Sequence, residues 1–249
     1  MSSESHMISK FAFVHPTAVV HRNVYIENGA VIEPFCVLGD DSADYVCIGA
    51  GCHVRSHSVV YGGVEIGEGT STGHYVMIRS GSKVGRSVSI GSYSVLEGNV
   101  EIGDCVRMQS ACQISPRCKV GDFAQLFASV QFTNDRLPPS GFVDGVMVEP
   151  LAIVASNVLL LAGVTVGMGA FVCAGSFVSS DVRPGMVVRG NPARPVFPVT
   201  KLMSLEHGFR YHPWLLRCRD RYPQWAQEKI DHYVYTLSKI VDNIDSKLD

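Results

Sequence analysis

The chain has little charge and no concentration of it. Only 18% of its 249 residues are charged, the formal net charge is -2, and no run of basic residues occurs. Nucleic-acid binding needs clustered Lys and Arg, so the composition does not favour it. No apolar run is long enough for a signal peptide or a membrane span. We therefore expect a cytoplasmic protein without a membrane span.

The cysteines also lack the spacing that is typical of metal sites. The eight cysteines include no CxxC pair, which is the spacing typical of zinc sites. Cys36, Cys52, Cys112 and Cys118 fall at positions where the repeat described next places small residues. We expect these four to act as small buried hydrophobes in a reducing compartment, and we expect no bound metal.

The chain does have a repeat of six residues. From residue 48 to residue 132 every sixth residue is apolar except Thr72, a small or β-branched residue follows four places later, and Gly often follows directly. Neither a helix nor an alternating strand has this period. It predicts a parallel β-helix, in which three units close a triangular coil of about eighteen residues.

Breaks in the register outline the domain organisation. The register begins near Val14, slips by four residues between Leu38 and Ile48, and returns from Val148 to Val178. Residues 133–147 interrupt it with two prolines and two glycines, which predicts a functional excursion loop. We predict a flexible N-terminus over 1–10, a β-helix domain over 11–195 and a tail over 196–249.

The tail carries a helical pattern. Apolar residues recur at helical spacing after Pro223, a residue suited to a first helical position. This predicts a C-terminal helix from about 223 to 246. We expect it to cap the open end of the prism or to pack on a neighbouring chain.

Several segments resemble the left-handed β-helix acyltransferases with hexapeptide repeats. Segments 66–74 and 96–103 resemble that family's repeats, and segments 163–167, 174–176, 181–185 and 190–194 resemble its C-terminal coils. The loop motif FTNDRLPP at 132–139 resembles the branch that N-acetylates amino sugars carried on a nucleotide diphosphate. The left hand of the helix is implied by this resemblance, because periodicity does not set it.

The resemblance implies a function and an assembly. The fold would be an all-β solenoid, a left-handed parallel β-helix, assembled as a homotrimer with each active site in the groove between two prisms. The activity would be an N-acyltransferase that uses acetyl-CoA and the amine of a nucleotide-linked amino sugar, for surface polysaccharide or glycoconjugate biosynthesis. The sugar, the nucleotide and the acyl chain stay open.

His74 is the best candidate for a general base. Residues eighteen apart stack in neighbouring coils, which places His74 next to Ser56 and Ser92 and beside His57. Histidine side chains commonly exchange protons near neutral pH, as a base that deprotonates an amine must. The alternative is a solvated or trimer-packed histidine. Asn99 is the second catalytic candidate, and His57 a weaker substrate-binding one.

Other candidates lie on turns and on the loop. Asn99 and Asn134 can bind sugar hydroxyls, although asparagine also suits turns in general. Asn134, Asp135 and Arg136 open the excursion, where the backbone is free to reach a ligand. Glu97 is a further substrate-binding candidate, with an ion pair to Arg79 as the alternative.

Coenzyme A has its own candidates, which the resemblance places on the C-terminal coils. Gly163, Ala174 and Gly175 would let the pantetheine arm approach the backbone. Arg189 and Arg194 would meet the phosphates. Turn geometry is the alternative for the two glycines.

Two other functions use the same kind of prism. A non-catalytic trimeric scaffold is possible, but it has no need of an excursion loop. A γ-type carbonic anhydrase needs three histidines on zinc from two subunits. His21, His53, His57 and His74 are available, although their spacing does not resemble that family. A bound-metal assay would discriminate.

Overall fold

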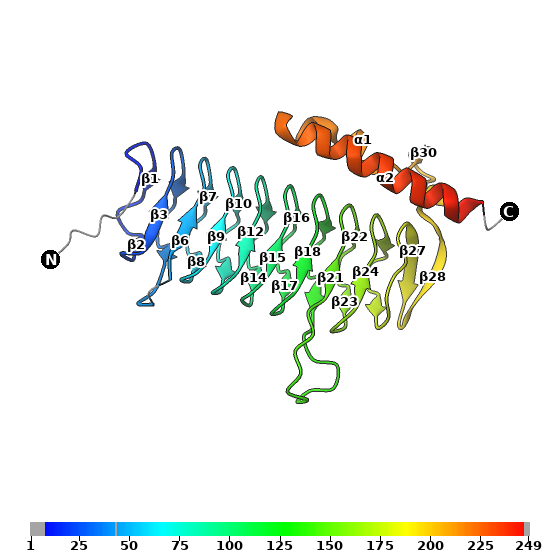
Figure 1. Cartoon of the computed structure of the whole chain (residues 1–249), viewed down its shortest axis with the longest axis horizontal. Helices are drawn as coiled ribbons and strands as arrows, with labels where there is room; N and C mark the ends of the chain where they lie inside the picture. Colours follow the sequence, from blue (N-terminus) through cyan, green and yellow to red (C-terminus); the bar gives the residue numbers. More distant parts are fainter. Residues whose placement is uncertain (1–7, 43, 247–249) are drawn as a thin grey trace.

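The computed structural model describes residues 8–42 and 44–246 and shows a long triangular prism of stacked coils (Figure 1). Most of the predicted flexible N-terminus, residues 1–7, lies outside the described residues. Within the described residues no helix is long and apolar enough to cross a membrane.

Three parallel sheets form the three faces of the prism, and the chain visits them in turn. The first face contains β1 (Phe13–Val14), β4 (Val31–Ile32), β7 (His53–Val54), β10 (Ser71–Thr72), β13 (Ser89–Ile90), β16 (Arg107–Met108), β19 (Gln125–Leu126), β22 (Ile153–Val154), β25 (Phe171–Val172), β27 (Met186–Gly190) and β28 (Ala193–Pro198). The second contains β2 (Val19–Val20), β5 (Val37–Leu38), β8 (Val59–Val60), β11 (Met77–Ile78), β14 (Val95–Leu96), β17 (Gln113–Ile114), β20 (Gln131–Phe132), β23 (Leu159–Leu160) and β26 (Phe177–Val178). The third contains β3 (Val24–Ile26), β6 (Val46–Ile48), β9 (Glu65–Ile66), β12 (Lys83–Val84), β15 (Glu101–Ile102), β18 (Lys119–Val120), β21 (Met147–Val148) and β24 (Thr165–Val166).

The predicted parallel β-helix and its register are confirmed. Ser71 pairs with Ser89 in the next coil, the eighteen-residue step of three six-residue units. Ile48 and Ile90 point inward and are each 1% exposed. The Cys52 thiol is fully buried and donates to the Gly67 carbonyl at 3.1 Å, so it fills its small space as a structural residue.

Close stacking explains one column of glycines. A Cβ on Gly67 would lie 2.7 Å from the backbone of Gly85, and a Cβ on Gly85 would lie 2.6 Å from the backbone of Gly103. Contacts this short are not tolerated between a side chain and a backbone. These glycines are therefore required by the approach of one coil to the next.

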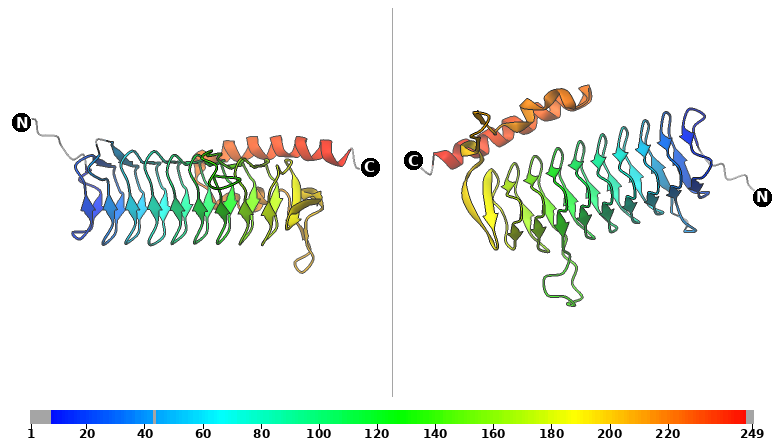
Figure 2. Two further views of the ribbon diagram at one scale, coloured as in Figure 1. Left: turned by 90° about the horizontal axis from the view of Figure 1, so that it is seen from below. Right: turned by 180° about the vertical axis from the view of Figure 1, so that it is seen from behind.

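Two segments depart from the coil. The loop between β20 and β21 projects away from the prism as a single excursion (Figures 1 and 2). At the C-terminal end the parallel coils stop at β27, because β28 returns antiparallel to it. The tail then forms a short hairpin of β29 (Met203–Ser204) and β30 (Phe209–Arg210), the helix α1 (Trp214–Arg217) and three 3-10 turns, Val199–Lys201, Arg219–Arg221 and Gln224–Ala226.

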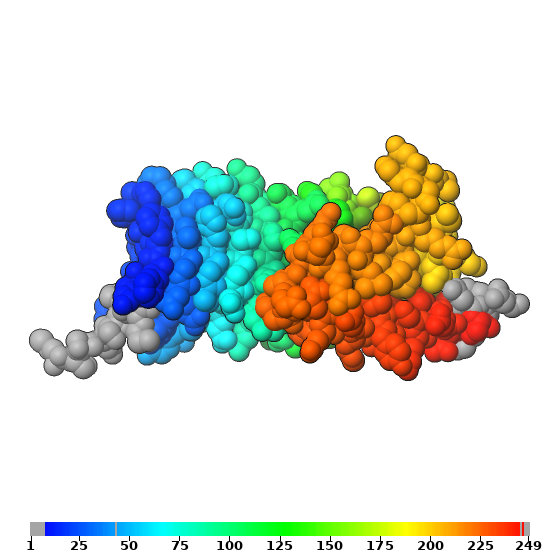
Figure 3. Space-filling view, turned by 90° about the horizontal axis from the view of Figure 1, so that it is seen from above, coloured from blue at the N-terminus to red at the C-terminus, as the bar shows by residue number. Residues whose placement is uncertain are grey.

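The long helix α2 (Gln227–Asp245) matches the predicted helix, but it does not cap the end of the prism. It lies along one edge of the C-terminal half and leaves the N-terminal coils uncovered (Figures 2 and 3). Its buried residues Ile230, Leu237 and Val241 pack with Phe123 and Leu151 of the coils. The capping prediction is wrong because apolar side chains on the flank of the prism, and not its end, supply the matching surface.

Candidate active site

The prism has three corners, which we name in chain order. The first corner joins the first face to the second, the second corner joins the second face to the third, and the third corner returns to the first face. His74 lies half exposed at the first corner, between β10 and β11. Its Nδ1 lies 2.9 Å from the Ser56 hydroxyl, and its backbone N–H donates to the Ser92 hydroxyl at 3.0 Å. The structure thus holds His74 within a column of hydroxyls.

Glu33 adds a carboxylate to the same corner. Its Oε1 lies 2.7 Å from His53 Nε2, its Oε2 accepts the Ser56 N–H at 3.1 Å, and Oε2 is 4.0 Å from His74 Nδ1. Burial would raise the pKa of Glu33, but the Ser56 N–H and the two imidazoles outweigh burial and lower the pKa. The carboxylate therefore stays ionised near neutral pH and can steady a positive charge on either imidazole.

His57 has a different environment from His74, although both lie at the first corner. Its ring lies between Phe35 and Tyr75, with centroids 5.0 Å and 4.6 Å away. Tyr75 stacks in turn on Tyr93 at 5.3 Å. His57 is thus one member of an aromatic ladder, which we define as Phe35, His57, Tyr75 and Tyr93.

Asn99 and Glu97 lie at the second corner, across the second face from His74. Asn99 takes a positive φ of 49°, a turn conformation that asparagine tolerates. Glu97 accepts a hydrogen bond from Gln113 at 2.8 Å instead of forming the ion pair considered with Arg79. One prism alone therefore does not bring the two predicted catalytic residues together.

Two of the predicted loop residues hold the loop itself. The Asp135 carboxylate accepts hydrogen bonds from the N–H groups of Leu137 and Ser140 at 2.9 Å and 2.7 Å. Its bonds to the side chain and backbone of Ser140 lower the pKa of Asp135. Arg136 donates to the carbonyls of Ala162 and Ser179, at 2.9 Å and 3.0 Å. Both side chains thus give the loop a defined shape and bind it to the prism.

Asn134 stands at the base of the loop, at the second corner. Its carbonyl accepts the Asp144 N–H at 3.0 Å, which closes the neck of the excursion. This bond uses only backbone, so the side chain of Asn134 is not needed to hold the neck together.

The predicted coenzyme A residues fall into three groups. Ala174 and Gly175 are exposed at the first corner, and a Cβ on Gly175 would meet nothing within 4 Å. Gly163 is exposed at the second corner. Arg189 and Arg194 are exposed directly opposite one another across β27 and β28. Arg194 Nη1 donates to the Ala193 carbonyl at 3.0 Å. Two arginines on paired positions suit phosphate, so this pair fits the diphosphate or 3′-phosphate of coenzyme A.

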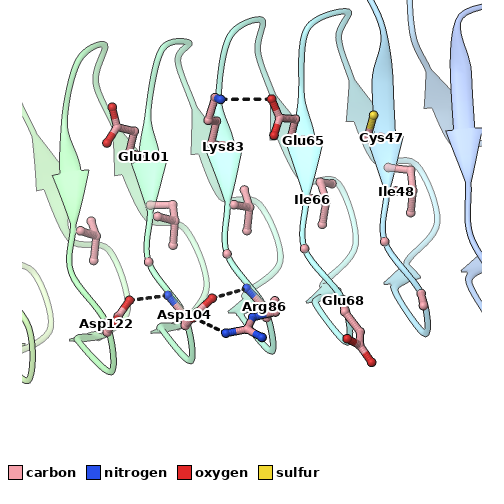
Figure 4. A pocket seen from close by; sticks show the side chains of 18 of the residues that line it. Cys47, Ile48, Glu65, Ile66, Glu68, Lys83, Arg86, Glu101, Asp104 and Asp122 are labelled. Carbon is pink, nitrogen blue, oxygen red and sulfur yellow. Dashed lines mark hydrogen bonds and ion pairs between the residues drawn. The ribbon is translucent and has the colours of Figure 1, made fainter. Parts of the chain in front are cut away.

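A long trough of about 1360 Å³ runs along the third face and the third corner (Figure 4). Its charges compensate one another: Lys83 pairs with Glu65 at 3.1 Å and Arg86 with Asp104 at 3.0 Å. None of the predicted site residues lines it. Its floor includes the glycine column required by coil stacking, which accounts for the small residues along this corner.

The role of Glu33 is not apparent from the spacing of residues in the sequence. The four-residue slip after Leu38 lengthens one coil, so Val31 pairs with His53 and the step is longer than eighteen. Stacking by eighteen therefore did not place Glu33 beside His53 or His74. If the four extra residues are counted as an insertion at the second corner, Glu33 falls in the same column as the residues around His53 and Ser56.

Known proteins resemble parts of this chain, although no family model matches it. A 2,3,4,5-tetrahydropyridine-2,6-dicarboxylate N-acetyltransferase from Staphylococcus aureus strain JH9 is 42% identical over 59 residues. This stretch covers 24% of our chain and 24% of that enzyme. The chain thus matches about a quarter of the length of the curated relatives.

Solved structures show the same architecture. LpxA from Acinetobacter baumannii is 20% identical, covers 77% of this chain and 74% of its own, and has a TM-score of 0.50. A UDP-N-acetylglucosamine acyltransferase from Bacteroides fragilis is 19% identical, covers 90% of this chain and 82% of its own, and has a TM-score of 0.49. The chain has the left-handed parallel β-helix fold, as the resemblance implied.

Proposed function

We propose that this protein is an acyl-CoA-dependent N-acyltransferase whose acceptor is the amine of a nucleotide-diphosphate-linked amino sugar, with acetyl as the acyl group. The observation that carries the proposal is His74, whose imidazole Nδ1 lies 2.9 Å from the Ser56 hydroxyl at an exposed corner. The local similarity to an N-acetyltransferase supports the reaction class. The loop motif at 132–139 supports the acceptor class.

The arrangement around His74 suits a base that accepts a proton from an amine. In the tautomer in which Nδ1–H donates to Ser56, Nε2 carries the lone pair and takes the proton. The Glu33 carboxylate, 4.0 Å from Nδ1, offsets the positive charge that then forms. Such proton transfer typically contributes about 10²- to 10⁴-fold to a rate.

Acyl transfer places few further demands on the chain. Acyl-CoA supplies an acyl group on a thioester, whose sulfur is a good leaving group. The amine nitrogen forms the new bond to the acyl carbon as the carbon–sulfur bond breaks, and the amine proton passes to His74. Holding the two substrates in line contributes much of the remaining acceleration. Arg189 and Arg194 would hold the phosphates, while Ala174 and Gly175 leave room beside the backbone.

A homotrimer would complete this site. Outward residues of the second face are apolar along five consecutive coils: Val19, Val37, Val59, Met77 and Val95. A contiguous apolar surface of this kind marks an interface. With the second faces turned toward a threefold axis, the first corner of one copy meets the second corner of the next.

That contact would unite residues that a single prism separates. His74 precedes β11 and Asn99 follows β14, so the two levels differ by one coil, about 4.8 Å. Asn134 follows β20, three coils from β11 or about 14 Å along the axis. A nucleotide sugar is long enough to reach from the loop of one copy to His74 of its neighbour. Asn99 and Asn134 are the sugar contacts in this proposal, and Glu97, Asp135 and Arg136 are further polar groups at the same corner or on the loop.

The test is product analysis by mass spectrometry. Purified protein is incubated with acetyl-CoA and a panel of nucleotide-linked amino sugars, and one sugar should gain an N-acetyl group. Sedimentation should give a mass near three times 27.0 kDa. If no sugar is acylated, the proposed function is wrong. A monomer mass would remove the shared site, and a trimer without activity would favour the scaffold.

A further inference from the structure

Three rings of the aromatic ladder at the first corner are stacked, and the fourth, Phe35, is tilted by 40° to His57. The rings of Tyr75 and Tyr93 are nearly parallel, with an interplanar angle of 5°, and His57 and Tyr75 are stacked at 21°. Phe35, Tyr75 and Tyr93 are all largely exposed, and Tyr93 is 64% exposed. Because exposing large aromatic side chains to water is unfavourable, this exposed ladder indicates a binding surface.

The ladder ends abruptly above Tyr93. The next residue in the column is Ala111, whose N–H donates to the Ser92 carbonyl in the same pattern by which Tyr93 N–H donates to His74. Ala111 keeps the same backbone conformation, with φ 61° against 63° at Tyr93. The coil continues but the ring is missing. The ladder therefore has a gap at Ala111, next to the Tyr93 side chain, which is 64% exposed.

Three glutamines occur on the coils at and next to Ala111. The outward residue of the second face changes from Val95 to Gln113 in the coil of Ala111, and the next coil has Gln131. Gln109 is exposed on the other side of Ala111. The Gln113 amide donates to Glu97 at 2.8 Å and so points toward the second corner. Gln109, exposed two residues before Ala111, is therefore the amide that belongs to the first corner. Amides both donate and accept, as the edge of a nucleobase does.

We propose that the gap in the ladder at Ala111, next to Tyr93, is a subsite for a nucleobase. The base would continue the ladder as its next ring, with Gln109 as the amide of the same corner. The inference rests on the proposed function for its two sources of a base, the nucleotide sugar and the adenine of acyl-CoA. The experiment separates these two sources.

The experiment measures the affinity of the full-length protein for UDP, GDP and CoA by calorimetry. Tyr93→Ala should lower the affinity for the nucleotide that uses the subsite by about 5- to 100-fold, the range for loss of an aromatic ring beneath a base. Ala111→Tyr should abolish that binding, because the new ring fills the gap. Tyr93 and Tyr75 already adopt the required backbone conformation, so the substituted chain should fold.

Two controls isolate stacking. Tyr93→Phe keeps the ring and should bind as the wild type does. Phe35→Ala removes a ring from the opposite end of the ladder and should leave affinity unchanged. Stacking on Tyr93 should also lower the absorbance of the bound nucleobase, and Ala111→Tyr should remove that signal.

The outcomes are distinct. A loss confined to UDP or GDP assigns the subsite to the nucleotide sugar. A loss confined to CoA assigns it to the adenine of the acyl donor and overturns the placement of the CoA phosphates on Arg189 and Arg194, four coils or about 19 Å away. The proposal is overturned if wild type binds none of the three, or if Tyr93→Ala and Ala111→Tyr bind as wild type. It is also overturned if these variants change only the sedimentation mass, because a second copy then covers the ladder. Nucleotide binding with the expected losses but no acyl transfer would refute the proposed function and keep the subsite.

Discussion

The first and third corners of the prism are built from the same repeat but change in opposite directions along it. The first corner has Phe35, His57, Tyr75 and Tyr93 in its N-terminal coils and then Ala111 and Ser129; the third has Gly29, Gly51, Gly69 and Ser87 and then Cys105, Phe123 and Leu151. Bulk at the third corner is buried under the C-terminal tail, whereas bulk at the first corner stays exposed. Large apolar residues at the third corner thus coincide with the part that the C-terminal tail covers.

The charged groups of the two corners also differ in whether they are paired within the chain. At the third corner Lys229 of α2 lies 2.7 Å from Asp104 and 2.8 Å from Asp122, and the Tyr233 hydroxyl donates to Asp122 at 2.9 Å. Arg86 lies over the Trp225 ring at 3.8 Å. These groups satisfy each other. At the first corner His74 faces solvent, which makes it available to a substrate.

The largest effect should come from the interior that both corners share. Ile90→Asp would place an unpaired charge in the prism, where Ile90 is 1% exposed, at a cost of several kcal/mol. We expect no soluble protein on expression. The outward neighbour Ser89→Asp should express normally. Soluble, cooperative unfolding of Ile90→Asp would refute the register.

The next largest effect should separate the corners by activity. His74→Ala should lower turnover by about 10²- to 10⁴-fold and leave the melting temperature near that of the wild type. Steady-state kinetics with the acceptor found by mass spectrometry provides the measurement. Unchanged turnover would mean that positioning alone carries the reaction, with Asn99 and the loop as the better site.

The third corner should respond in the opposite way. Lys229→Met leaves Asp104 and Asp122 facing each other, and we expect a loss of about 1–3 kcal/mol of unfolding free energy. The lower part of that range applies if water screens the ammonium, whose side chain is 39% exposed. Turnover should not change. Lys239→Met, on the exposed side of α2, is the control for denaturant unfolding.

The smallest effect concerns pH at the third corner. Burial would raise the pKa of Asp104, but Arg86 and Lys229 outweigh it and lower the pKa to about 2. Because the pKa of Asp104 is lower in the folded chain than in the unfolded chain, the carboxylate stabilises the fold when the pH is above the unfolded pKa of 3.8. This contribution is lost as the pH falls toward the folded pKa of about 2. Between those values wild type should lose more stability than Asp104→Asn, measured by thermal unfolding. Parallel curves would contradict the assigned role of Asp104.

Much of the fold could be predicted because each six-residue unit has its own inward apolar residue, small residue and turn residue. Ile48 and Ile90 are inward, and Cys52 fills its small space, as the period requires. The excursion loop was predicted from its prolines and glycines, but the roles of Asp135 and Arg136 within it were not. Their partners Ser140, Ala162 and Ser179 are set by the path of the loop, which no local pattern specifies.

The position of the helix shows the same division. Its apolar spacing predicted α2, and the change from Ser87 to Cys105 and Phe123 at the third corner was a readable signal for its binding surface. The spacing alone does not reveal this surface, because an apolar residue at a corner indicates a binding surface only if its side chain points outward. The corner itself follows only once the coil is closed.

The sequence by itself determined the solenoid, its register, its interrupting loop and the existence of a C-terminal helix. Each depends on steric and hydrophobic preferences within a few residues, which repeat at a fixed period. Tertiary structure decided which corner the helix covers and how Glu33 reaches the environment of His74. Those outcomes depend on contacts such as Lys229 with Asp104, between segments far apart in the chain, whose free energy exists only after the coils have stacked.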